Sequence, residues 1–522
     1  MKTRCVLWLI LPLFILIPAH AQQWVQTYDI QTEEPTRISV NSDGSLIIAT
    51  SVGKSAGGLQ ICALKASSTG SVQWAKGYDE PLSSSANGCR QLKSGNFLLW
   101  GSRTPKFDNS HANSTDAVLL ELSPAGAIAL QKTYGVGKWN YEYTFNHVDE
   151  LAAGGYIACG EIEHLNKSTD WYNDESKGWI VRLDAAGAVL FQKAIAVKTS
   201  DPYKYLDMTD VRQTADGGYI SVGWYYFGGT WTTTDVGILI LKMNAAGDIL
   251  WQKIYDAGDY GRAEAPFGKF LIEAWRIIPT SDGGYMLVGC DWVDEVPWAA
   301  KLDATGKVQW ARKFAPKSYD DDLELRDASL AKDGGCMFAG VVYPESGSRL
   351  AWFAKMTSTG AAKVNRTYVL GGHYYNHFLG ISELAAGGFA LIGRSYNDYT
   401  SRELCSMTTN PSGATCPKVK PNKYKPLQQA FALYEKTATF VIGKGTAAAT
   451  PGKFVISNLS APQTSWCGGL LAAAPSAGED AAADGQLEQM LRHRAPSAAD
   501  RPAPSTFSCL RDFVRGHRSM SN

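Results

Sequence analysis

Two short stretches of the sequence carry residues that could bind a metal ion. His373 and His377 stand four residues apart, which is the spacing of two zinc ligands on one face of a helix. Asp320, Asp321 and Asp322 are consecutive carboxylates, the hard oxygen ligands that Ca²⁺ prefers. The histidines, however, fall where a loop enters an expected strand, and the aspartates lack the spaced pattern of a calcium loop. No metal site is therefore predicted.

Aromatic side chains gather in the longer stretches between apolar runs, beside acids such as Asp170, Asp174 and Glu175. Aromatic rings stack on sugars or peptides, while carboxylates and amides fix hydroxyl groups. The alternative is that these rings only hold long loops in place. Catalytic residues stay unassigned, because the separation of a carboxylate pair is a three-dimensional quantity. Ligand contacts are predicted for Trp139, Tyr141, Trp171, Tyr172, Trp224, Tyr225, Trp231, Trp292, Tyr374 and Tyr375.

A short glycine motif recurs at intervals of 51 to 66 residues, as in Asp216-Gly217-Gly218-Tyr219. A phosphate-binding loop is one reading of such glycines. Repetition at a fixed place favours a backbone role instead, because glycine adopts a positive φ without steric cost. The first glycines of the copies are Gly44, Gly95, Gly154, Gly217, Gly283, Gly334 and Gly387.

A second motif interleaves with the first and continues into an aromatic and basic strand, as in Gly306-Lys307-Val308-Gln309-Trp310. Each repeat thus holds four short strands with glycine turns after the first and third strands. Such repeats predict an all-β protein, a β-propeller of four-stranded antiparallel blades. A solenoid or a tandem of small sandwiches is the alternative. The recurring aromatics Trp74, Phe191, Trp251 and Trp310 are expected to pack between blades.

The seventh repeat lacks its own last strand, because the chain after Gly413 reads Ala414-Thr415-Cys416-Pro417, and proline fits poorly inside a ladder. An extra copy of that strand stands near the N-terminus, as Gln23-Trp24-Val25-Gln26-Thr27-Tyr28. We therefore predict a seven-bladed ring that is closed by the N-terminal strand.

Polar residues alternate with apolar ones in the first strand of each repeat, which places the polar set near a central channel. Because both signs of charge occur, a mutually neutralised, hydrated lining is expected, with a bound ligand or ion as the alternative. The predicted lining residues are Arg37, Arg90, Asp149, Asp210, Arg212, Arg276 and Asp327. The short turns emerge at one face of the ring, and the long, individual loops emerge at the other face, where function is expected.

The chain ends differ from the repeats. Residues 1–21 have a basic start, an apolar run and an Ala19-His20-Ala21 cleavage site, so a signal peptide, cleavage after Ala21 and a secreted or periplasmic protein are predicted, with a membrane anchor as the alternative. Residues 22–419 are assigned to the propeller and 420–460 to a short β extension, a hairpin capping the ring. Residues 461–522 form a low-complexity segment that we expect to be disordered. A disulfide between Cys405 and Cys416 is also predicted.

Taken together, the Asp-Gly-Gly-Tyr-Ile pattern and Lys301-Leu302-Asp303-Ala304-Thr305-Gly306, followed by Trp310, resemble a known group. Secreted bacterial β-propeller repeat proteins carry such units, and the second half is similar to the tryptophan-docking repeat of pyrroloquinoline-quinone (PQQ) propellers. The resemblance spans about residues 23 to 413 and implies the fold. A quinoprotein would imply PQQ, a cation and a catalytic carboxylate.

Composition narrows the function. Fifty Lys and Arg residues balance fifty Asp and Glu residues, so no global field attracts nucleic acid. The resulting hypothesis is a secreted, monomeric, non-catalytic propeller without an integral membrane segment, which binds a glycan, peptide or surface component through its long-loop face. The alternative is a propeller enzyme, either a glycan hydrolase or lyase or a quinoprotein-like oxidoreductase. No cofactor is predicted, and PQQ or Ca²⁺ remains the alternative.

Overall fold

The computed structural model of the chain consists of strands, turns and connecting segments, with no helix among the residues it describes and hence no helix able to cross a membrane there. The described residues are 23–31, 33–54, 57–79, 83–104, 114–136, 140–164, 175–199, 204–227, 235–256, 272–291, 296–315, 322–344, 348–370, 375–396 and 403–416, followed by 421–422, 427–430, 434–436, 440–444, 448–451, 455–458 and 463–467.

Each sequence repeat forms a unit of antiparallel strands, numbered here in chain order. Unit 1 contains β2 (Glu33–Val40), β3 (Leu46–Gly53), β4 (Leu59–Ala66) and β5 (Val72–Asp79); unit 2 contains β6 (Ser83–Gln91), β7 (Phe97–Thr104), β8 (Asp116–Leu122) and β9 (Ile128–Gly135). Unit 3 contains β10 (Tyr141–Glu150), β11 (Tyr156–His164), β12 (Glu175–Leu183) and β13 (Val189–Val197); unit 4 contains β14 (Lys204–Gln213), β15 (Tyr219–Phe227), β16 (Asp235–Met243) and β17 (Ile249–Asp256).

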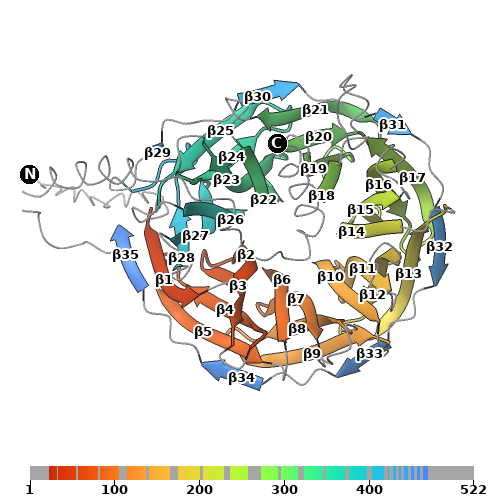
Figure 1. Cartoon of the computed structure of the whole chain (residues 1–522), viewed down its shortest axis with the longest axis horizontal. Coiled ribbons are helices and arrows are strands. Elements are labelled where there is room, and N and C mark those ends of the chain that lie inside the picture. Colours follow the sequence, from red (N-terminus) through yellow and green to blue (C-terminus); the bar gives the residue numbers. More distant parts are fainter. Residues whose placement is uncertain are drawn as a thin grey trace, which may run out of the picture.

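The later units follow the same plan. Unit 5 contains β18 (Ile272–Pro279), β19 (Tyr285–Asp291), β20 (Val296–Leu302) and β21 (Val308–Ala315); unit 6 contains β22 (Asp322–Leu330), β23 (Cys336–Tyr343), β24 (Leu350–Met356) and β25 (Ala362–Tyr368). Unit 7 contains β26 (Tyr375–Glu383), β27 (Phe389–Tyr396) and β28 (Glu403–Thr408). The units lie around a centre toward which their first strands point, in a propeller-like, all-β arrangement (Figure 1).

The first hairpin turn of unit 4 shows why the glycine motif recurs. The Gly217 amide donates to the Thr214 carbonyl at 2.9 Å, and the Thr214 amide donates to the Gly218 carbonyl at 2.9 Å. This turn requires a φ of 78° at Gly217, in the left-handed region that side chains strain. The predicted backbone role of the motif is therefore confirmed.

The two sequence motifs are partners in space. Asp216 of the turn accepts a hydrogen bond from the Gly218 amide at 3.0 Å, and Lys242 of β16 lies 2.8 Å from Oδ2 of Asp216. Hydrogen bonds from Lys242 and Thr214 lower the pKa of Asp216 to about 2. The same pair recurs as Asp282 with Lys301 and Asp333 with Lys355. In these three units an ion pair with a lysine on the third strand thus fixes the aspartate of the first turn.

Neighbouring units dock through the last strand of one and the second turn of the next. In unit 1, Trp74 Nε1 donates to the Pro124 carbonyl at 3.0 Å and Tyr78 Oη donates to the Gly126 carbonyl at 2.9 Å. A side chain at Gly126 would approach the Trp74 ring to 3.2 Å. Phe191, Trp251 and Trp310 lie in the same way against Gly247, Gly306 and Gly360, which confirms their predicted packing between repeats.

The N-terminal strand β1 (Val25–Gln31) completes the sheet of unit 7. It pairs antiparallel with β28, where Val25 lies opposite Met407. Trp24 Nε1 donates to the Ser68 carbonyl at 2.9 Å, and Tyr28 Oη donates to the Gly70 carbonyl at 2.9 Å. Both groups therefore make toward unit 1 the contacts that Trp74 and Tyr78 make toward unit 2.

The first strand of every unit contains an irregularity that sequence periodicity did not predict. In β10 the pairing with β11 shifts between Phe145 and His147, so Asn146 is an extra residue. Because of this bulge, Phe145 and Val148 pack in one core cluster although they stand three residues apart. Equivalent shifts occur in β2, β6, β14, β18, β22 and β26.

The C-terminal extension does not form the predicted hairpin. Its strands are β29 (Pro421–Asn422), β30 (Leu427–Ala430), β31 (Tyr434–Lys436), β32 (Phe440–Lys444), β33 (Ala448–Pro451), β34 (Val455–Asn458) and β35 (Gln463–Cys467). Each pairs with the last strand of a different unit and none with another C-terminal strand. The prediction of a hairpin is wrong, because the last strand of each unit would otherwise leave backbone N–H and C=O groups unpaired at its outer edge. An extended C-terminal strand pairs with these groups. Strand β35 also lies within the segment expected to be disordered. The predicted signal peptide lies outside the described residues.

The predicted disulfide is also wrong. Cys405 is a reduced, buried thiol, whereas Cys416 is disulfide-bonded to a different cysteine. Spacing about the turn suggested the pair, but Cys405 lies on β28, whose neighbours are β27 and β1. The chain after the turn therefore does not return beside Cys405 as a paired strand.

Removing residues 22–28 should strongly destabilise the protein, because the deletion exposes the edge of β28 and removes the fully buried Trp24, Val25 and Tyr28. A loss of several kcal/mol is expected from buried aromatic truncation alone, at about 3–5 kcal/mol for each large ring. Thermal unfolding and size-exclusion chromatography measure this. Deletion of 468–522 is the control and should leave the melting temperature nearly unchanged. An unaltered melting temperature in the first deletion would contradict the role of β1.

Candidate functional site

The predicted channel-lining residues lie on the first strands near the centre and form ion pairs across units. Arg90 pairs with Asp149, and Arg212 lies 3.7 Å from Asp149 and 3.1 Å from Asp210. Arg276 and Arg37 lie 3.4 Å and 4.0 Å from Asp327. The seven predicted residues thus form two ion-pair groups, one of two arginines with two aspartates and one of two arginines with a single aspartate.

All three aspartates also join neighbouring units through the backbone, and Asp149 accepts a hydrogen bond from the Gln213 amide at 3.3 Å. Asp210 accepts a hydrogen bond from the Ile277 amide at 3.0 Å, and Asp327 accepts one from the Ile381 amide at 3.1 Å. His147 lies beside Asp210 at 3.4 Å, yet its pKa is well below the usual value because of burial and the nearby arginines. The lining residues therefore contact one another and the backbone of neighbouring units, which favours a structural role over ligand binding.

Of the predicted ligand-binding aromatics, six lie outside the described residues: Trp139, Trp171, Tyr172, Trp231, Trp292 and Tyr374. Tyr141 is half-buried, and its ring lies 4.6 Å from that of His164. Tyr375 is half-buried, stacked on Tyr396 at 4.9 Å and contacted by the Arg349 guanidinium. Tyr141 and Tyr375 therefore keep part of their surface accessible.

Trp224 and Tyr225 are corrections to that set. Tyr225 is fully buried in an apolar cluster, and Trp224 is 5% exposed beneath the ring of Tyr205. Both stand inside β15 and not in the loop that follows it. The strand runs farther than the apolar pattern suggested, so these rings are packing residues and not exposed ligand contacts.

In the part of the chain that the structure describes, no group of three or more His, Cys, Asp or Glu side chains is placed to hold a metal ion. His377 is buried in β26 between the rings of Tyr343 and Tyr396. His373, Asp320 and Asp321 lie outside the described residues, and Asp322 begins β22.

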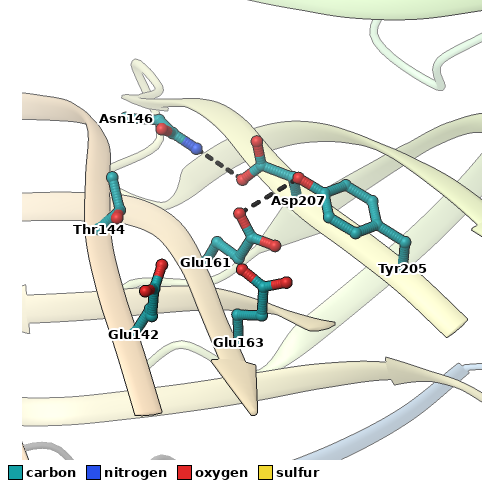
Figure 2. A pocket seen from close by; sticks show the side chains of 7 residues that line it. All are labelled: Glu142, Thr144, Asn146, Glu161, Glu163, Tyr205 and Asp207. Atoms are coloured by element: carbon teal, nitrogen blue, oxygen red, sulfur yellow. Dashed lines mark hydrogen bonds between the residues drawn. The ribbon is translucent and has the colours of Figure 1, made fainter. Parts of the chain in front are cut away.

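A polar pocket opens between units 3 and 4, where the first strands begin. Figure 2 shows its seven lining side chains, which come from β10, β11 and β14. The pocket contains about 360 Å³ of open space, including its mouth. The beginning of β10 and the end of β11 adjoin the long connecting segments, so the pocket lies on the face expected to be functional. Its lining residues are Glu142, Thr144, Asn146, Glu161, Glu163, Tyr205 and Asp207.

Two carboxyl groups lie at the base of the pocket, and each has a hydrogen-bond donor. Asn146 Nδ2 donates to Asp207 Oδ1 at 2.5 Å, and Tyr205 Oη donates to Glu161 Oε2 at 3.2 Å. Ser176 Oγ also donates to Glu161 Oε1 at 2.5 Å. Figure 2 shows Glu161 and Asp207 side by side, with Asn146 and Tyr205 on opposite sides. The donors orient both carboxyl groups.

Burial holds these carboxyl groups partly protonated. The pKa of Asp207 is raised to about 7 by burial, although the Asn146 hydrogen bond opposes the shift. The pKa of Glu161 is raised well above its usual value, first by burial and then by the negative charges of Asp207 and Glu163. Two neighbouring carboxyl groups with raised pKa values are a feature of many general acid and base sites.

The bulge of the first strand explains why sequence analysis did not find the pocket. If side chains alternated strictly from His147 backwards, Phe145 would face the polar side of the strand. The extra residue Asn146 shifts the alternation by one position, so Thr144 faces that side instead. In unit 4 the same reversal selects Asp207 instead of Met208. The signal was available as a recurrent acidic position: Asp207, Glu273 and Glu324 each stand ten residues before the first glycine of their repeat.

In units 5 and 6 the equivalent acids, Glu273 and Glu324, accept hydrogen bonds from nearby side chains. Trp275 Nε1 donates to Glu273 at 3.1 Å, and Glu324 accepts from Arg326 at 2.8 Å and Tyr343 at 2.7 Å. A neutral Asn146 in unit 3 instead faces Asp207. Burial raises the pKa of Asp207, and the Asn146 hydrogen bond only partly opposes the shift.

No family model matches the sequence, and no curated protein matches it. Among solved structures, the chain is similar to an intramolecular trans-sialidase from Ruminococcus gnavus, at 10% identity and a TM-score of 0.34 over 74% of this chain and 96% of that one. It is also similar to a β-fructofuranosidase from Bombyx mori, at 11% identity and a TM-score of 0.28 over 79% and 94%. Similarity at this level carries no functional argument, so function is argued from the site alone.

Replacing Asp207 by Asn should stabilise the protein at pH 8 and leave stability nearly unchanged at pH 4. The folded state raises the pKa of this acid, so its contribution to stability is lost as pH rises from the unfolded value near 4 to about 7. The neutral amide avoids this loss, which is on the order of 4 kcal/mol. Urea unfolding across pH 4–8 measures the difference.

Asp216→Asn is the matched control with the opposite sign. The pKa of Asp216 is lowered, so its stabilising pair with Lys242 is present at neutral pH and lost only as pH falls toward about 2. A destabilisation at pH 7 is expected, because the substitution removes the charge partner of the buried Lys242 ammonium. Equal effects of the two substitutions at pH 8 would contradict the assignment of Asp207.

Proposed function

We propose that the protein is a secreted seven-bladed β-propeller that binds a glycan through the face carrying its long connections. The single observation that carries the ligand class is the pocket between units 3 and 4, which is lined by carboxyl, amide and hydroxyl groups together with the ring of Tyr205. Carboxyl, amide and hydroxyl groups complement the hydroxyl groups of a sugar, whereas the apolar side chains of a peptide would find no partner there.

The propeller architecture is supported by the pairings of the units. Each repeat contributes four strands in sequence order, except the seventh, to which β1 supplies the last strand. Trp24 and Tyr28 then contact unit 1 as equivalent residues contact later units. A ring closed by the N-terminal strand explains both sets of contacts. The recurring Asp-Gly-Gly and Lys-Leu-Asp motifs support membership of the secreted bacterial propeller repeat proteins.

Export is supported by two observations. Residues 1–21 follow the pattern of a signal peptide, and Cys416 is disulfide-bonded. Disulfides persist in oxidising compartments and are rare in the cytosol.

A catalytic version of this function is favoured by one feature, the paired Glu161 and Asp207. A protonated carboxyl next to an ionised one is what glycoside hydrolysis requires of its acid and of its nucleophile or base. In that case Asp207 or Glu161 would donate a proton to the leaving oxygen while the other group acts on the anomeric carbon or on water. Binding and hydrolysis use the same pocket, so one set of variants tests both.

Glu161→Gln and Asp207→Asn should weaken binding of a glycan identified on a polysaccharide panel by at least tenfold, as measured by calorimetry, because each removes an acceptor at the base of the pocket. Asp216→Asn, on the short-turn face, should leave affinity unchanged. Release of reducing sugar by the unaltered protein, lost in both pocket variants, would assign hydrolysis. Unchanged affinity in both pocket variants would rule out this pocket as the binding site.

A further inference from the structure

The C-terminal segment surrounds the propeller-like body as a continuous strap. Its strands β29 to β35 pair in turn with the last strands of units 6, 5, 4, 3, 2, 1 and 7. Figure 1 shows these strands, coloured light blue to blue, outside the sheets around the whole perimeter. The strap therefore runs against the direction of the repeats and makes one full circuit.

The spacing of the strap strands matches this course. Successive strands begin six to eight residues apart, and an extended segment of that length spans roughly 20–29 Å. Each strand has only two to five residues, which is enough to pair an outer edge that would otherwise expose unpaired backbone groups. One strap strand per unit thus covers every outer edge.

Both ends of the strap arrive at the sheet of unit 7. Cys416 follows β28 of that unit and is buried in a cluster with Val25 and Met407. At the other end, Cys467 of β35 lies opposite Val25 of β1 in the backbone pairing. Val25 belongs to the buried cluster that contains Cys416. The circuit therefore brings the backbone of Cys467 beside that cluster.

The partner of Cys416 can be found by elimination. The chain has ten cysteines, of which six are reduced: Cys62, Cys89, Cys159, Cys290, Cys336 and Cys405. Cys416 is disulfide-bonded, which leaves Cys5, Cys467 and Cys509 as partners. Cys5 belongs to the predicted signal peptide, and Cys467 is the one that the described backbone brings to the sheet of unit 7.

We propose that Cys416 and Cys467 form a disulfide that closes the strap into a covalent hoop around the ring. Two thiols lose two protons and two electrons and form one S–S bond, while a low-molecular-weight disulfide such as oxidised glutathione accepts both electrons and becomes two thiols. The bond closes a loop of roughly 50 residues, a length at which cross-linking removes much entropy from the unfolded chain. It also ties the outermost strand of unit 7 to the chain that leaves the same unit.

Peptide mapping of the intact full-length protein under non-reducing conditions tests the hoop. The expected result is one linked pair of peptides, containing Cys416 and Cys467. A link from Cys416 to Cys509 or Cys5, or both cysteines found as thiols in protein from an oxidising compartment, would overturn the proposal.

Substitutions provide a second measurement that does not depend on mapping. Cys416→Ser, Cys467→Ser and the double variant should each lower the melting temperature by the same amount, on the order of 5 °C. Reduction should produce that shift in the unaltered protein and none in the variants. Cys405→Ser is the matched control, because Cys405 is a reduced thiol in the same buried cluster; its sensitivity to reductant should be retained. Additive effects of the two single substitutions, or a Cys467→Ser variant that still responds to reductant, would contradict the hoop.

Discussion

The fold depends on one repeated contact, the docking of an outer-strand tyrosine on the second turn of the next unit. Tyr28, Tyr78, Tyr134, Tyr255 and Tyr368 each donate a hydrogen bond to a glycine carbonyl there. The glycine is needed twice, for its positive φ and because a side chain would strike the docking strand. Burial raises the pKa of Tyr368 to about 12, so the phenol stays a donor across the physiological range. Five of the seven units contact the next unit in this way, whereas Ile195 and Phe314 stand at the equivalent positions of β13 and β21.

Sequence reasoning predicted this framework because its determinants are local. A glycine turn and an aromatic strand lie within one repeat, and their recurrence along the chain made both visible. The strap was missed for the opposite reason. Its strands are short, and their partners lie far away in the sequence, as Cys467 and Val25 do. Only the exposed outer edges require such strands, and edge exposure is a property of the assembled sheets.

The candidate site also contains residues that sequence periodicity could single out and residues that it could not. The charged residues between the bulge and the turn, such as Arg37 and Asp327, stand where strict alternation applies, so periodicity alone could single them out. Beyond the bulge the parity reverses, so Thr144, Asp207 and Glu324 face the polar side that alternation assigns to Phe145, Met208 and Leu325. A single extra residue, Asn146 in unit 3, thus separates the predictable half of the strand from the half that lines the pocket.

The two buried carboxyl groups of the pocket, Glu161 and Asp207, are unfavourable in their ionised form. Burial raises the pKa of both Glu161 and Asp207, so each ionised carboxylate costs stability that a cation at this place would restore, as Arg326 does for Glu324. Unit 3 supplies the neutral Asn146 instead, whose amide donates to Asp207. Among the described residues, Glu161 and Asp207 thus receive hydrogen bonds from neutral donors, and buried carboxyl groups with raised pKa values are a feature that binding and catalytic sites often have.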